Sequence, residues 1–178
     1  PHLAKALAPH TARIAKQLSK GARLERVAAS QVLRALARCP DANGALCDAC
    51  LDACADSLFT HPHADVLHVH CADVLLAIID RKPLHAHAAK RLERLLFRDN
   101  STEGGLLSRI RSTLTGLERP KNSRDAHLVV LGEAVCAALR EDEAKPGAGL
   151  VPDLLYARRP DLDAWLHFVE DLARLTAR

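Results

Sequence analysis

The cysteines are the residues whose spacing could best support chemistry. Cys47, Cys50 and Cys54 follow one another at intervals of three and four positions, which places the three thiols on one face of a helix. Zinc takes four Cys or His ligands that converge from several directions. A complete site would therefore need a ligand from one of five nearby residues, namely His61, His63, His68, His70 and Cys71. Because Leu51 and Leu58 share this face and free cysteine packs as a small hydrophobe, we predict reduced, metal-free core cysteines.

The ten histidines are the second group that could bind a metal or a proton. Residues two positions apart on a helix point away from each other, which makes poor joint ligands of the pairs His68/His70 and His85/His87. The sequence contains no HExxH motif. We expect surface histidines, with pH sensing as the alternative because imidazole titrates near neutral pH.

Catalytic and nucleotide-binding motifs are missing from the sequence. There is no P-loop, GxGxxG or GxSxG pattern, and Gly104-Gly105 lacks the rest of a phosphate-binding loop. Ser108 and Ser112 have no His and acid partners in a recognisable order. We therefore predict a protein that is not an enzyme, that binds no cofactor and that takes no small-molecule substrate.

Positive charge gathers between positions 90 and 124. Such a stripe can follow the phosphates of RNA or meet an acidic protein surface, and it can also be an ordinary solvated helix face. Aromatic residues for base stacking are not interleaved with it. The predicted partner-binding residues are Lys90, Arg91, Arg94, Arg98, Arg109, Arg111, Arg119, Lys121 and Arg124.

Helices must position all of these residues. Hydrophobic residues make up 48% of the chain and aromatic residues only 3%, and Ala, Leu and Arg, which dominate, are strong helix formers. Gly and Pro breaks divide the sequence. The expected helices cover about residues 3–20, 23–38, 43–59, 64–80, 83–98, 103–117, 124–140, 151–157 and 161–177.

Several details of these helices can be predicted. Gly21 should end the first helix, and Leu24 should join the core contacts of the second. Ser101 or Thr102 should cap the sixth. The fourth and seventh helices have the least polar circumference and should be the most buried.

Short connections predict antiparallel helix pairs. Residues 30–36 resemble residues 72–78 at an offset of 42 positions, which lies in the range of HEAT and armadillo repeats. We predict one all-α domain over residues 1–178, built as a HEAT/armadillo-like α-solenoid. The helix at 161–177 should cap the solenoid, with an apolar stripe facing inward and a solvent-exposed outer side. That stripe comprises Leu162, Trp165, Leu166, Val169 and Leu172.

Charge and hydropathy limit the cellular setting. The formal net charge is only +3, and no apolar run approaches the roughly 20 residues of a membrane span. The long, core-rich chain does not need disulfides. We expect a cytoplasmic protein, or a mitochondrial matrix protein if a presequence has been removed, with no membrane partner.

Short blocks of sequence resemble a known family in order and spacing. The blocks are Phe59 followed by Leu67-His68 and Val74-Leu75, Leu106 to Ile110, Ala126-His127-Leu128, and Asp163 to Val169. From about Arg23 onward the chain resembles the C-terminal part of the SAPS family, the helical-repeat regulatory subunits of protein phosphatase 6. The resemblance implies a helical-repeat fold and a phosphoprotein phosphatase as partner.

These observations predict a non-catalytic scaffold or regulatory domain that binds a protein partner. The alternative is a structural subunit of an organellar assembly, such as a mitochondrial ribonucleoprotein, that contacts RNA through the basic stripe. Residues 34–38, Arg-Ala-Leu-Ala-Arg, resemble a block found in helical repeats of such particles.

Overall fold

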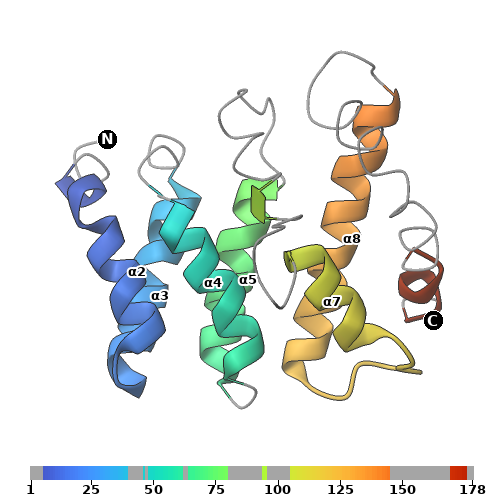
Figure 1. Ribbon diagram of the computed structural model, residues 1–178, viewed down its shortest axis with the longest axis horizontal. Coiled ribbons are helices and arrows are strands. Elements are labelled where there is room, and N and C mark those ends of the chain that lie inside the picture. Colours follow the sequence, from blue (N-terminus) through green and yellow to red (C-terminus); the bar gives the residue numbers. More distant parts are fainter. Residues whose placement is uncertain are drawn as a thin grey trace. The chain divides into compact units, whose positions relative to one another are not determined.

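A computed structural model describes residues 6–39, 46, 48–61, 64–79, 94–95, 105–144 and 169–175, without the side chains of 8, 136 and 138–144. The regular elements of these residues are all helices, with no strand among them, which confirms the all-α class. In chain order the elements are η1 (Ala8–His10), α2 (Thr11–Lys20), α3 (Arg23–Arg38), α4 (Asp48–Thr60), α5 (Asp65–Ile79), α7 (Leu106–Leu114) and α8 (Ser123–Ala144) (Figure 1).

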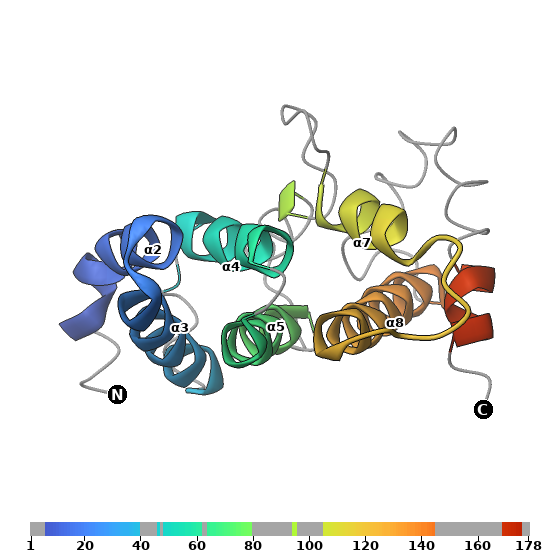
Figure 2. The same cartoon turned by 90° about the horizontal axis from the view of Figure 1, so that it is seen from below.

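The chain divides into two compact units, Pro1–Ile78 and Ile79–Arg178. In the first unit, α2 packs against both α3 and α4. Figure 2 shows α2 and α4 side by side in one layer and α3 and α5 in the other. In the second unit, α7 packs against α8. The single domain over residues 1–178 stays a prediction.

Helix α3 has the bounds that the sequence predicts, but Leu24 does not lie in the core. Leu33 and Leu36 are buried, whereas Leu24 is 82% exposed. Leu24 and Leu33 are nine positions apart, about half a turn around a helix, so burying Leu33 turns Leu24 toward solvent. The expectation for Leu24 was therefore wrong.

The predicted first helix is interrupted within the described residues. Pro9 lies in the 3-10 turn η1, and α2 begins only at Thr11. Leu18 is fully buried at the other end of α2. Gly21 follows α2 as predicted, but its backbone is extended, with φ −71° and ψ 165°, rather than left-handed.

Close approach, not backbone conformation, requires glycine at position 21. A Cβ there would lie 2.5 Å from the carbonyl oxygen of Gln17 and 3.0 Å from the side chain of Glu25. We expect Gly21→Ala to lower the free energy of unfolding by about 1–3 kcal/mol, as overpacking does, measured by urea denaturation. Ala22→Gly, at the next and exposed position, is the control. Equal stability of Gly21→Ala and the native protein would contradict this reading.

The two helices expected to be most buried, α5 and α8, differ in how much of their surface is exposed. In α5 only Asp65 and Val66 are exposed, so its enclosure is confirmed. Helix α8 keeps an exposed stripe, so its enclosure was wrong. The stripe recurs every three or four residues, on one side of the helix, and consists of Ala126, Val130, Glu133 and Ala137.

In the second unit, α7 is shorter and α8 longer than predicted. Extended Gly105 precedes α7 and no side chain caps it, while Ser101, Thr102 and residues 151–157 lie outside the described residues. In the predicted fifth helix only Arg94 and Leu95 are described; both are helical, Arg94 exposed and Leu95 buried.

Residues 169–175, in the predicted closing helix, are also helical. Leu172 and Leu175 are buried there, and Glu170 and Arg174 are exposed. Residues 161–168, Trp165 among them, lie outside the described residues.

Candidate partner-binding surfaces

The structure divides the predicted basic stripe. Lys90, Arg91 and Arg98 lie outside the described residues. Arg109 and Arg124 are half-buried. The remaining predicted residues are exposed, and they are Arg94, Arg111, Arg119 and Lys121.

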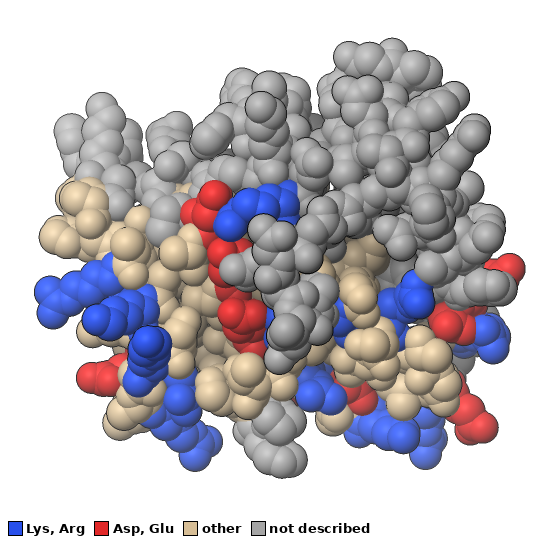
Figure 3. Space-filling model, viewed as in Figure 1, with Lys and Arg blue, Asp and Glu red and all other residues tan. Residues whose placement is uncertain are grey.

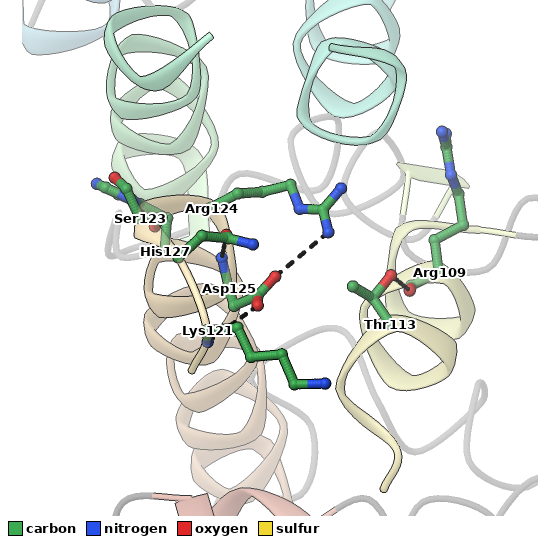
Figure 4. A network of polar contacts seen from close by, with 8 residues as sticks. Arg109, Thr113, Lys121, Ser123, Arg124, Asp125 and His127 are labelled. Carbon is green, nitrogen blue, oxygen red and sulfur yellow. Dashed lines mark hydrogen bonds and ion pairs between the residues drawn. The ribbon is translucent and has the colours of Figure 1, made fainter. Parts of the chain in front are cut away.

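A capping arrangement at the start of α8 involves the guanidinium of Arg124 and the backbone of Lys121 (Figure 4). Asp125 donates its backbone N–H to the Oδ1 of Asn122 at 2.9 Å, which is an N-cap hydrogen bond. The carboxylate of Asp125, only 3% exposed, accepts the backbone N–H of Lys121 at 3.1 Å. It also pairs with the guanidinium of Arg124, at 3.3 Å from Nη2 to Oδ1. The negative charge also lies where the helix dipole favours it.

The stripe is therefore not one continuous set of cations. Arg124 is committed to Asp125, and its buried Nε has no hydrogen-bond partner among the described residues. Arg109 comes from α7, and its side chain points away from Asp125 (Figure 4). Its backbone carbonyl accepts the hydroxyl of Thr113 at 2.8 Å. In α7 and the loop that follows it, three cations are exposed and have no ion pair to a described residue. They are Arg111, Arg119 and Lys121.

Helices α3 and α5 share a buried polar network that the sequence analysis did not identify. Ser30 Oγ donates to the carbonyl of Val27 at 2.7 Å and lies 2.9 Å from Nδ1 of His70. The direction of this contact depends on the histidine tautomer; with the serine proton on the Val27 carbonyl, the Nδ1–H of His70 is the donor. His68 and His70 are both buried, so the expectation of surface histidines was wrong at these positions.

One carboxylate holds two arginines beside this network. Asp73 Oδ2 lies 2.6 Å from Nε of Arg34 and 2.9 Å from Nη2 of Arg38. The arginines are one helical turn apart on α3, so both reach the same acid on α5. The sequence held a signal for this contact. Arg34 and Arg38 are four positions apart, and Asp73 is the one acid in the segment 72–78 that resembles residues 30–36.

Protonation of His70 should destabilise the first unit. Burial lowers the pKa of His70 below its ordinary value of 6.5, and Arg34 adds to this effect. Asp73 opposes the shift and Arg38 supports it. Because the folded pKa is depressed, the stabilisation is complete above pH 6.5 and is lost as pH falls through the folded pKa. We expect the melting temperature to fall as the pH is lowered from 7.5 to 5.5.

The variant His70→Asn tests this prediction, because it cannot titrate in this range. Its melting temperature should change less over the same pH interval than that of the native protein. His10→Gln, at an exposed position, should keep the native pH dependence. Identical pH profiles for His70→Asn and the native protein would show that another group is responsible.

The thiols lie in the core between α2, α4 and α5. Cys50, Cys54 and Cys71 are fully buried and form no disulfide with one another, which confirms the core prediction for Cys50 and Cys54. Cys47 lies outside the described residues. Cys50 Sγ donates to the carbonyl of Thr11 at 3.3 Å. A hydrogen bond with Cys71, together with burial, raises the pKa of Cys54, so its thiol stays protonated and unreactive.

The described residues show neither a cluster of metal ligands nor a membrane-spanning helix. Across the described parts of the chain, no group of three His, Cys, Asp or Glu side chains is arranged to hold a metal ion. That the cysteines are metal-free stays a prediction. Among the same residues, no helix combines the length and apolar character that a bilayer crossing requires.

The structure thus defines an all-helical protein with layered helices, a buried polar network in one unit and a capped basic helix start in the other. No family model, no curated protein and no solved structure matches the chain. The resemblance to the SAPS family stays a prediction.

Proposed function

We propose that this chain is a non-catalytic helical-repeat scaffold that binds an acidic surface of a protein partner. One observation carries the proposal: Arg111, Arg119 and Lys121 are exposed and form no ion pair with any described residue. Residues 105–127 contain five basic and two acidic residues. Of the two acids, Asp125 is buried, and only Glu118 is exposed. The surplus of positive charge therefore faces solvent.

Burial at matching positions supports an α-solenoid of HEAT or armadillo type. The segments offset by 42 positions lie in α3 and α5, which occupy one layer of the first unit (Figure 2). Leu33 and its counterpart Leu75 are fully buried, and so are Ser30 and Ala72. The two segments thus bury equivalent positions, as repeats do.

The resemblance to the SAPS family makes the catalytic subunit of a phosphoprotein phosphatase the first partner to test. Immobilised chain and purified catalytic subunit would be compared by biolayer interferometry. The triple variant Arg111→Ala, Arg119→Ala, Lys121→Ala should weaken binding about tenfold or more, from three exposed charge contacts of up to about 1 kcal/mol each.

A control of equal net charge separates a local contact from general electrostatics. The exposed stripe of α8 can take three acids, which lowers the charge by the same three units: Ala126→Glu, Val130→Glu and Ala137→Glu. The control should bind as the native chain does. Equal weakening by both triple variants, or no binding by the native chain, would refute the proposal for this partner.

The second candidate is RNA, favoured by the same three exposed cations. If they neutralise three phosphates of a single strand, the logarithm of the binding constant should fall with the logarithm of salt concentration with a slope of about −2. Titration of a labelled oligonucleotide measures this slope. Salt-sensitive RNA binding that the Arg111, Arg119, Lys121 variant abolishes would replace the protein scaffold by the ribonucleoprotein function.

A further inference from the structure

The largest local excess of basic over acidic residues in the described part of the chain lies on α2 and α3, outside the predicted stripe. Residues 6–39 contain seven basic residues and one acidic residue, Glu25. Residues 48–79 contain five Asp and neither Lys nor Arg. Basic and acidic charge are therefore separated along the chain within the first unit.

Contacts within the first unit use three of the seven cations. Arg34 and Arg38 pair with Asp73, and Arg26 donates to the carbonyl of Gly21 at 3.2 Å. The one acid is also committed, because the Glu25 carboxylate accepts the backbone N–H of Ala22 at 2.8 Å at the start of α3.

Four exposed cations remain without an ion pair to any described residue, and they are Arg13, Lys16, Lys20 and Arg23. The first three fall at i, i+3 and i+7, on one face of α2. This face is opposite to Ala15 and Leu18, which are buried. Figure 3 shows Lys and Arg side chains gathered over α2.

An apolar side chain adjoins these cations. Leu24 follows Arg23 at the start of α3 and has the greatest exposure of any large hydrophobic residue described, 82%. Gly21 makes the turn between Lys20 and this segment. Protein interfaces combine apolar contacts at the centre with a polar rim, and Leu24 with the cations that precede it along the chain offers both kinds of side chain.

We propose that this surface, formed by Arg13, Lys16, Lys20, Arg23 and Leu24, docks an acidic segment of another protein that carries an apolar side chain among its carboxylates. Charge complementarity selects the acidic segment, and Leu24 selects protein over nucleic acid. Residues 6–39 contain no Phe, Tyr or Trp on which a base could stack. The surface is separate from the cations of α7 and the loop that follows it, and it does not depend on the function proposed for them.

Synthetic peptides test this surface directly by fluorescence anisotropy with the full chain. The first is a labelled helical peptide with Glu at i, i+3 and i+7 and one Leu; the second has Ser in place of that Leu. We expect the first to bind several-fold more tightly. Arg13→Ala, Lys16→Ala, Lys20→Ala should weaken it about tenfold or more, and Leu24→Ser should remove the preference for the Leu peptide.

Two controls make the result specific. The acidic triple variant of α8 described above has the same net charge as the α2 triple variant and should bind the peptide normally. Val66→Ser alters another exposed apolar residue of the first unit and should keep the preference for Leu. A circular dichroism spectrum checks that each variant is folded.

Three results would overturn the proposal. One is a uridine oligonucleotide that binds more tightly than the Leu peptide and is insensitive to Leu24→Ser, which assigns the surface to nucleic acid. Another is equal binding of the two peptides by the native chain. The third is self-association of the chain that the α2 triple variant abolishes, which makes a second copy the occupant.

Discussion

Leu75→Ala is expected to lower the free energy of unfolding by about 2–5 kcal/mol, the usual cost of a cavity at a leucine site in a packed core. Leu75 is fully buried in the middle of α5, and α5 is enclosed along almost its whole length. The ion pair of Asp73 with Arg34 ties α5 to α3, and the hydrogen bond of Cys71 with Cys54 ties it to α4, which restrains the two neighbouring helices. They can therefore collapse only partly into the space left by the leucine.

Val66→Ala provides the matched control on the same helix. Val66 is 54% exposed, so its truncation should change stability by about 0.5 kcal/mol or less. Urea denaturation followed by circular dichroism measures both variants. Similar losses at the two positions would show that α5 is not the enclosed helix of the first unit.

Asp125→Ala is expected to cost on the order of 2 kcal/mol or more. The buried carboxylate accepts the N–H of Lys121 and pairs with Arg124, and its removal leaves both groups without this acceptor. Breaking a buried pair by removing one partner costs several kcal/mol. The estimate is reduced here because 20% of the Arg124 side chain is exposed to solvent.

Asp125→Asn separates charge from hydrogen bonding. An amide oxygen can still accept the N–H of Lys121, so this variant should lose less stability than Asp125→Ala. Glu133→Gln, which neutralises an exposed acid on the same helix, should leave the urea midpoint nearly unchanged. If Asp125→Ala and Glu133→Gln had equal midpoints, the start of α8 would not depend on the buried carboxylate.

The candidate surfaces could be predicted only in part. The exposure of Arg111, Arg119 and Lys121 agrees with a basic surface. The pairing of Arg124 was not predicted, although Asn122 and Asp125 stand three positions apart, the spacing of an N-cap and its third helical residue. The spacing of Arg13, Lys16 and Lys20 places these cations on one face of α2. That they remain exposed, with no ion pair to any described residue, depends on how α3 and α4 pack against that helix.

The sequence alone determined what depends on neighbours along the chain. The helical class follows from Ala, Leu and Arg propensity, and the bounds of α3 follow from the local breaks at Gly21 and after Arg38. The burial of Cys50 and Cys54 follows from their place on an apolar stripe. Each of these features depends on interactions within about one or two helical turns, which a sequence shows directly.

The tertiary structure decided which side of each helix faces a neighbour. Ser30 meets His70 across 40 positions, and Arg34 meets Asp73 across 39, so a polar network is buried where the sequence analysis expected surface histidines. Leu24 and Val130 remain in solvent although they belong to apolar patterns. A helix with apolar residues on several sides can bury any of them, and the packing of the other helices selects which side becomes core.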